Sequence, residues 1–378
     1  MDRFWWQIPG PNQYVADIVQ DLIDGKNVVL CLPKHMPAGL SSAVRLEIGE
    51  EWHWQTFSLL EENETEPVHQ LFNIFVREIS PTEIRNARTL AQHQDFGGKI
   101  IWIENLTPPL WGPWKKFLTN YEQSCRSVSK WNRTLFCVPL IGDLAIDPPR
   151  EDVCLSHHYW RGVVDRLDIL LFTAHLFSGK QLSDLQKQVA ISAIANLALW
   201  DPNVSEWLAY ESLEHILNPL PILLEIGQSR CWCDEMISSG SDSWHRGVKD
   251  IIEGEEKIHS AALAFNDSTK EIDRRIWSAQ VGVLLPFVEE RRQELLSTCK
   301  DILTVPFQTN FGVISDLRDL EIGHIEYQLN SNLAGNRNIK RLAEQLKDIR
   351  NALSHLEPIN HQLLLSREIN DWRRILGK

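Results

Sequence analysis

The chain has 378 residues, of which 43% are hydrophobic and 24% charged, and its formal net charge is −13. A chain of this length predicts two or three domains, each able to bury its own core. The acidic balance excludes a protein that binds nucleic acid through its overall charge, so any contact with RNA or DNA requires a local basic patch.

The apolar segments and the cysteines of the sequence both predict a cytoplasmic protein. The first residues contain no apolar stretch followed by a cleavage site, and no apolar run in the chain reaches the length of a membrane span. The seven cysteines show no pattern of paired spacings. We therefore expect reduced thiols, no contact with a membrane and no metal site.

Residues 1–150 alternate between helical and strand patterns. Apolar residues recur every three or four positions in three predicted helices, at 14–23, 68–79 and 114–128. Short apolar runs predict buried strands at 28–32, 99–104 and 134–140, and a less apolar strand at 54–60. Strands that alternate with helices indicate a largely parallel sheet covered on both faces, so residues 1–150 are predicted to form an α/β domain.

The layout of this domain resembles the P-loop NTPases. Their phosphate-binding loop follows the first strand and has the pattern Gly-x4-Gly-Lys-Ser/Thr. Here Gly39 and Ser41 match this pattern, whereas Lys34 stands at the first glycine position and Leu40 at the lysine position. A later strand ends in Glu104, which stands where these proteins carry an acid that polarises water.

The resemblance implies a degenerate fold that does not hydrolyse nucleotides and that uses no cofactor. Pro33 and Pro37 stiffen the loop, and each removes a backbone N–H that a phosphate would need. Gly39, Ser41 and Glu104 are then the remnants of a nucleotide site. Two alternatives stay open, namely nucleotide binding without turnover and an unrelated α/β domain.

A polar, proline-containing break at 147–152 predicts a domain boundary. The spacing of apolar residues beyond it predicts helices at 159–177, 182–199 and 205–217. We interpret residues 151–250 as a helical connector or a winged-helix-like segment. A serine-rich stretch at 238–243 predicts a linker.

The remaining residues, 255–378, predict an all-α bundle. Helical spacing covers four stretches, at 270–303, 311–329, 339–356 and 361–376. The predicted fold class is therefore α/β followed by all-α.

The third of these helices carries a polar group of residues near its end. With Ala352 and Leu353 facing a core, Asn351 and His355 lie four residues apart on the opposite surface, beside Arg350. An imidazole can transfer protons near neutral pH, and a guanidinium stabilises a charged phosphate. From 340 to 378 the chain has eight Lys/Arg against five acids, a local balance of +3 that suits an anionic substrate.

This run resembles the Arg-Asn/Asp/His-…-His motif of the HEPN superfamily of helical ribonucleases. The resemblance implies a metal-independent endoribonuclease that acts on RNA. His355 would transfer the proton of the ribose 2′-OH or protonate the leaving oxygen, Arg350 would stabilise the phosphorus centre, and Asn351 would orient the imidazole. It also implies a homodimer formed through the C-terminal helices, with two motifs in one cleft.

A structural alternative fits the same residues, with Arg350 in surface contacts and His355 capping its helix. Three other pairs in the chain have a similar spacing, beginning at Arg88, Arg150 and Arg318. The leading hypothesis is an RNA-cleaving effector of a bacterial defence or toxin-type system, regulated by the NTPase-like domain and associated with a protein partner. The alternative is a non-catalytic scaffold or adaptor in a larger complex.

Overall fold

The computed structural model describes residues 3–50, 52–59, 66–77, 84–232, 243–266, 268–310, 312–331 and 336–378. The chain divides into two compact units. We call residues 1–168 with 234–259 the α/β unit, and residues 169–233 with 260–378 the helical unit. Each is described by itself.

The α/β unit is built on a five-stranded sheet in which all paired neighbours are parallel. The strands are β1 (Asn27–Leu32), β2 (His53–Ser58), β3 (Lys99–Glu104), β4 (Leu135–Ile141) and β5 (Leu155–Tyr159). Their order across the sheet is β2-β3-β4-β1-β5. All six residues of β1 are buried, because the strand has a neighbour on each side and helices on both faces. Val29 of β1, for example, lies opposite Val138 of β4 and His157 of β5.

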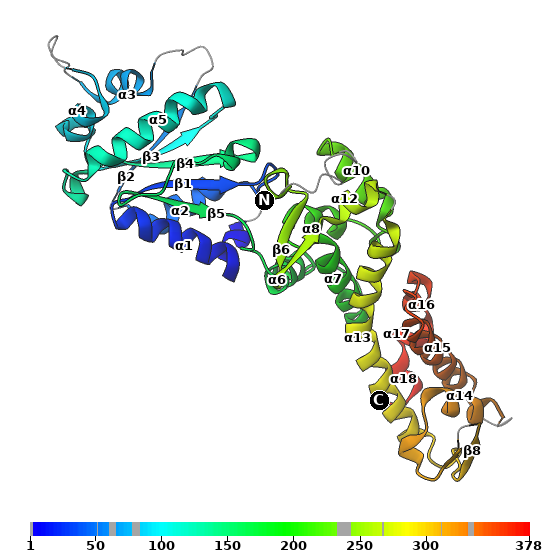
Figure 1. Cartoon of the computed structure of the whole chain (residues 1–378). Coiled ribbons are helices and arrows are strands. Elements are labelled where there is room, and N and C mark those ends of the chain that lie inside the picture. Colours follow the sequence, from blue (N-terminus) through cyan, green and yellow to red (C-terminus); the bar gives the residue numbers. More distant parts are fainter. Residues whose placement is uncertain are drawn as a thin grey trace. The chain divides into compact units, whose positions relative to one another are not determined.

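Helices cover both faces of this sheet (Figure 1). One face carries α1 (Pro9–Ile23) and α2 (Leu40–Ile48), and the other carries α3 (Pro67–Phe75), α4 (Ala87–Gln92) and α5 (Pro108–Cys125). The chain runs from β1 to the far edge at β2 and then returns strand by strand. Crossovers between parallel strands are right-handed. The helices that follow a step toward β2 therefore lie on one face of the sheet, and those that follow a step back toward β5 lie on the other. The chain therefore leaves β1 toward one face and β3 toward the other, which opens a crevice at the carboxyl ends of the strands.

Short elements complete the α/β unit. They are η1 (Arg3–Gln7), η2 (Gln94–Phe96), η3 (Lys130–Asn132), η4 (Gly142–Ile146), η5 (Trp244–Arg246) and a hairpin of β6 (Lys249–Ile252) and β7 (Glu255–Ile258). The segment with η5 and this hairpin is distant from β5 in sequence, but it contacts the residues that directly follow β5. The indole N–H of Trp244 donates to the carbonyl of Trp160 at 3.1 Å, and the N–H of Gly162 donates to the Asp250 carboxylate at 2.9 Å.

The parallel sheet and the three buried strands predicted from the sequence are confirmed, as is the less apolar strand. The helix predicted at 159–177 begins only at Arg166, and residues 155–159 before it form β5, a strand that was not predicted. The sheet thus extends past the boundary expected at 150. As an edge strand, β5 has a paired neighbour on one side only, and its sequence Leu-Ser-His-His-Tyr gives no continuous apolar run.

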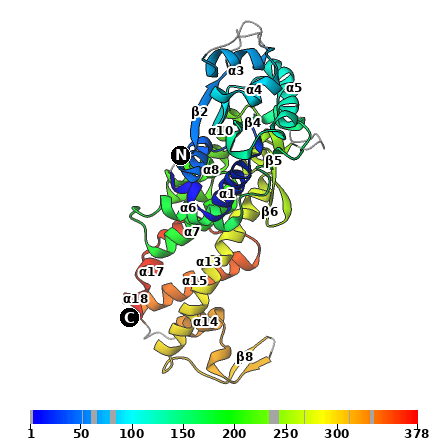
Figure 2. The same ribbon diagram turned by 90° about the vertical axis from the view of Figure 1, so that its left-hand side faces the viewer.

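The helical unit begins within α6 (Arg166–Leu176). It contains α7 (Asp184–Ala198), α8 (Pro202–Ala209), α9 (Leu213–Leu217), α10 (Leu220–Ser229), α12 (Ser260–Phe265), α13 (Thr269–Thr298), α14 (Ile322–Ser331) and α15 (Arg337–Ser354). Three short helices, α16 (His361–Leu365), α17 (Arg367–Asn370) and α18 (Trp372–Ile375), end the chain. Both views place α14 and α15 alongside the long helix α13 (Figure 2).

Several helical predictions in this unit are wrong in part. The helix predicted at 205–217 is divided into α8 and α9. Residues 307–314 form a hairpin of β8 (Phe307–Thr309) and β9 (Gly312–Ile314), followed by η6 (Leu317–Asp319), so the helix predicted at 311–329 begins only at Ile322. The helix predicted at 361–376 is divided into three. The linker predicted at 238–243 lies outside the described residues except for Ser243. Among the described helices, none is both long and apolar enough to span a bilayer.

Candidate functional site

The predicted RNA site lies at the C-terminal end of α15. Five residues of this helix are buried at spacings of three or four and face the interior of the unit: Leu342, Ala343, Leu346, Ile349 and Leu353. Both Arg350 and Asn351 are partly exposed, Asn351 on the opposite side of the helix and Arg350 at the margin of the buried face. The local amphipathic pattern therefore directs the polar residues of the motif toward the surface.

His355 is the residue that ends the helix. Its backbone N–H donates to the carbonyls of Asn351 and Ala352 at 3.0 and 3.1 Å, and its φ and ψ are −93° and 11°. The side chain is exposed, and its imidazole makes no hydrogen bond to any part of the chain that the structure describes.

Arg350 is held by an acid from the neighbouring segment. Its guanidinium donates to the Glu321 carboxylate at 2.8 Å and to the side-chain oxygen of Asn351 at 3.3 Å. The Arg350 side chain is 42% exposed and that of Glu321 62%, so this is a solvated ion pair. It is the kind of surface contact that the structural alternative predicts for Arg350. Among the described residues, no contact joins these groups to the imidazole of His355.

The three similar Arg–His pairs differ from this one in the state of the imidazole. The ring of His93 accepts a backbone N–H at 3.2 Å, and the ring of His324 accepts one at 3.1 Å. The side chain of His157 is only 8% exposed. The imidazoles of these three residues therefore have structural roles, whereas that of His355 is open to solvent. The sequence spacing alone does not reveal this difference.

The end of α15 is anchored by residues of α13 that the sequence analysis does not identify. The indole N–H of Trp277 donates to the carbonyl of Leu353 at 2.8 Å. The fully buried side chain of Gln280 donates to the carbonyl of Ile359 at 2.9 Å and accepts its N–H at 2.7 Å. These bonds fix the chain on both sides of His355. No local sequence signal marks them, because they join residues almost 80 positions apart.

The second set of predicted residues, Gly39, Ser41 and Glu104, lines a single pocket in the α/β unit. The pocket has a volume of about 430 Å³ and lies at the carboxyl ends of β1, β3 and β4, in the crevice described above. This is the position at which open α/β sheets commonly bind ligands.

The loop between β1 and α2 is held tightly beside this pocket. The indole N–H of Trp6 donates to the carbonyl of Ala38 at 3.0 Å. Gly39 has a φ of 100°, and a Cβ at this position would lie 2.9 Å from the Trp6 nitrogen. A glycine is thus required here by both conformation and space.

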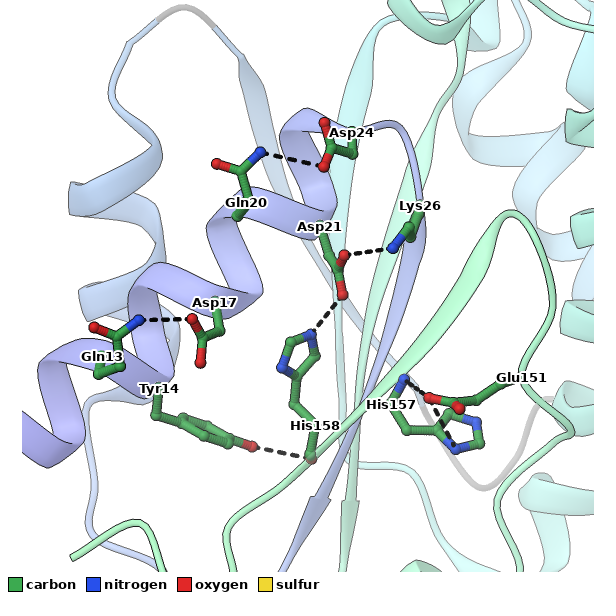
Figure 3. Close-up of polar contacts among 10 residues, drawn as sticks. All are labelled: Gln13, Tyr14, Asp17, Gln20, Asp21, Asp24, Lys26, Glu151, His157 and His158. Atoms are coloured by element: carbon green, nitrogen blue, oxygen red, sulfur yellow. Dashed lines mark hydrogen bonds and ion pairs between the residues drawn. The ribbon is translucent and has the colours of Figure 1, made fainter.

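A third polar group joins α1 to the edge strand β5 (Figure 3). The ring of His158 lies 2.9 Å from the Asp21 carboxylate, which also accepts from Lys26 at 2.7 Å. Burial raises the pKa of Asp21, but hydrogen bonds from Lys26 and His158 outweigh it and hold this pKa below its usual range. The next ring, that of His157, points to the other side of β5 near Glu151. The two histidines therefore do not converge.

The described residues contain no group of three His, Cys, Asp or Glu side chains placed to hold a metal ion. A comparison with protein-family models finds no match to the chain, and a search of curated proteins finds no similar sequence.

Proposed function

We propose that the protein is a metal-independent endoribonuclease whose site is formed by Arg350, Asn351 and His355. The observation that carries the proposal is the imidazole of His355, which is exposed and has no hydrogen bond within the described chain, one turn beyond an arginine and an amide. A surface imidazole that packing does not use is available for proton transfer.

The chemistry requires one proton acceptor, one proton donor and a cation. The neutral ring of His355 accepts the proton of the ribose 2′-OH while the 2′ oxygen bonds to phosphorus. The bond from phosphorus to the 5′ oxygen then breaks, and this oxygen takes a proton from the imidazolium of a second copy. The products are a 2′,3′-cyclic phosphate and a 5′-hydroxyl. Arg350 stabilises the negative charge at phosphorus, and Asn351 orients the groups.

The second copy is supplied by a homodimer formed through the C-terminal helices. In this proposal residues 255–378 are a HEPN-like bundle, residues 1–150 a degenerate P-loop-like domain that regulates it, and the intervening segment a connector. The setting is a cytoplasmic bacterial defence or toxin-type system with a further protein partner. The parallel sheet and the pocket at its carboxyl edge support the regulatory part.

The test is cleavage of single-stranded RNA by the full chain in the presence of EDTA. We expect His355→Ala to lower the rate by at least about 100-fold, because general acid–base catalysis supplies that factor. His215→Ala is a matched control. His215 is also exposed, but it lies on α9 and pairs with Glu211. Cleavage that is equal in the two variants would rule out the proposed site.

A second candidate function, a scaffold or adaptor, is favoured by exposed aromatic side chains. The Trp131 side chain is 66% exposed and stacks on Trp52 with ring centroids 6.1 Å apart, and Lys130 lies 5.1 Å from the Trp131 ring. Exposed tryptophans are typical of protein interfaces. This function predicts a stoichiometric partner that Trp131→Ala releases, together with an unchanged phenotype for His355→Ala.

A further inference from the structure

The pocket beside Gly39 has the opposite electrostatic character from a phosphate site. It is lined by Leu32, Met36, Pro37, Ala38, Gly39, Leu40, Ser41, Trp102, Ile103, Glu104, Asn105, Leu106, Pro139 and Ile141. Among these described lining residues, Glu104 is the one that carries a charge, and it is negative. A phosphate placed here would meet a carboxylate and no lysine or arginine from the lining.

Part of the loop before α2 has no backbone donor to offer a phosphate. Pro33 and Pro37 have no N–H. The N–H of Lys34 already donates to the carbonyl of His245 at 2.8 Å. Three positions of the loop are therefore unavailable to a phosphate. The N–H groups of the first turn of α2 are the backbone donors that remain, and the described lining of the pocket adds no side-chain cation to them.

The polar end of the pocket offers hydrogen-bond acceptors. Glu104 provides two carboxylate oxygens, and Asn105 follows it with a positive φ of 58°. The Asn105 amide nitrogen donates to the Ser58 hydroxyl at 2.8 Å, which leaves its side-chain oxygen as an acceptor. The rest of the lining is mainly aliphatic and aromatic. This combination suits a flat apolar body with N–H donors at one end.

The geometry points to a ligand without phosphate that presents two adjacent N–H donors on a planar group to Glu104. A carboxylate accepts two parallel N–H bonds from such a group. The amide and amine edge of a guanine base and a guanidinium ion share this chemistry. The volume of about 430 Å³ is in the range of pockets that hold small organic ligands. This inference does not depend on the ribonuclease proposal.

Calorimetric titration of the full chain with guanosine, agmatine, inosine and GTP tests the inference. It also distinguishes a guanine base from a guanidinium ion as the bound group. Saturable binding of guanosine, with inosine at least about tenfold weaker because it lacks the amine, identifies a guanine edge. Saturable binding of agmatine instead identifies a guanidinium. Absence of binding by both guanosine and agmatine overturns the inference, as does tighter binding of GTP than of guanosine.

The affinities of three variants test whether the ligand binds in this pocket. Glu104→Gln should weaken the probe that binds at least about tenfold. Glu47→Gln, which changes the same charge on the exposed face of α2 outside the pocket, should leave the affinity unchanged. Ile141, which is 48% exposed at the mouth, allows a second test that is independent of charge, because Ile141→Trp should block entry. Affinity that survives both Glu104→Gln and Ile141→Trp overturns the assignment.

Discussion

At the scale of single residues, the Glu321 carboxylate decides how available Arg350 is. The carboxylate lies 2.8 Å from the guanidinium and would compete with an RNA phosphate for it. We expect Glu321→Gln to lower KM for RNA by up to about fivefold at low salt, because exposed ion pairs contribute at most about 1 kcal/mol. The measurement is KM at two salt concentrations, since screening weakens the competition.

A matched control for this variant lies in α14, the helix that begins directly after Glu321. Glu326 pairs with Lys347 at 3.1 Å and does not contact Arg350, so Glu326→Gln should leave KM unchanged. An equal effect of the two variants would mean that net charge, not the release of Arg350, controls binding.

The sequence identifies the residues of both candidate sites but not their surroundings. It singles out Arg350 and His355, yet it cannot separate them from three pairs of similar spacing, because the distinction depends on whether each imidazole is used in packing. The bond from Arg350 to Glu321 is a tertiary contact between residues 29 positions apart, which the sequence does not reveal. Gly39, Ser41 and Glu104 were expected to be near one another, and the parallel order of the strands brings them to one pocket.

At the scale of elements, the bonds between Gln280 and Ile359 hold the segment after α15 against α13. Gln280→Leu removes both partners and leaves a buried N–H and a buried carbonyl unpaired. We expect a loss of about 3 kcal/mol in the free energy of unfolding, measured by urea denaturation, from the usual cost of unpaired buried polar groups.

The same helix provides the comparison for this variant. Gln293 is exposed and its side chain donates to Glu289, so Gln293→Leu should change the free energy of unfolding by less than about 0.5 kcal/mol. A similar small change for Gln280→Leu would show that the segment is not held by these bonds.

The edge strand β5 gives the α/β unit a dependence on pH. Burial lowers the pKa of His157, and the nearby Glu151 offsets this only in part. Since the folded pKa lies below the unfolded value near 6.5, the unfolded chain binds the proton more readily. The stability that neutral His157 provides is therefore complete above pH 6.5 and is lost as the pH falls toward the folded pKa.

His157→Gln removes this titration. We expect the urea midpoint of the wild type to fall more steeply between pH 7.5 and 5.5 than that of His157→Gln, whereas the exposed His215→Gln should keep the wild-type slope. Identical slopes for wild type and His157→Gln would assign the pH dependence to other groups.

Strands can be predicted from the sequence where their apolar residues form a continuous run. Buried strands such as β1 and β3 are apolar runs because both faces are covered. The segment 307–314 instead has apolar residues at spacings that also fit a helix, whereas the structure pairs β8 with β9 in a hairpin. The sequence alone does not choose between these states.

At the scale of the whole molecule, the α/β unit is made from two separate stretches of chain. Sequence reading places a boundary where composition changes, near residue 150, because it cannot detect that 234–259 returns to the same unit. The returning stretch supplies Trp244 and Asp250, whose bonds hold the chain just after β5. Domain limits therefore depend on long-range contacts that carry no local signal.

A fragment that ends at residue 150 tests this organisation. It lacks β5, so the fully buried strand β1 would become an exposed edge, which favours aggregation. We expect residues 1–150 to show no cooperative thermal transition by circular dichroism. A fragment ending at residue 162 restores β5 and should recover part of the transition, at a lower temperature than the full chain because Trp244 and Asp250 are still missing. A cooperative transition in the shorter fragment that equals that of the longer one would show that β5 and the returning stretch are not part of the folding unit.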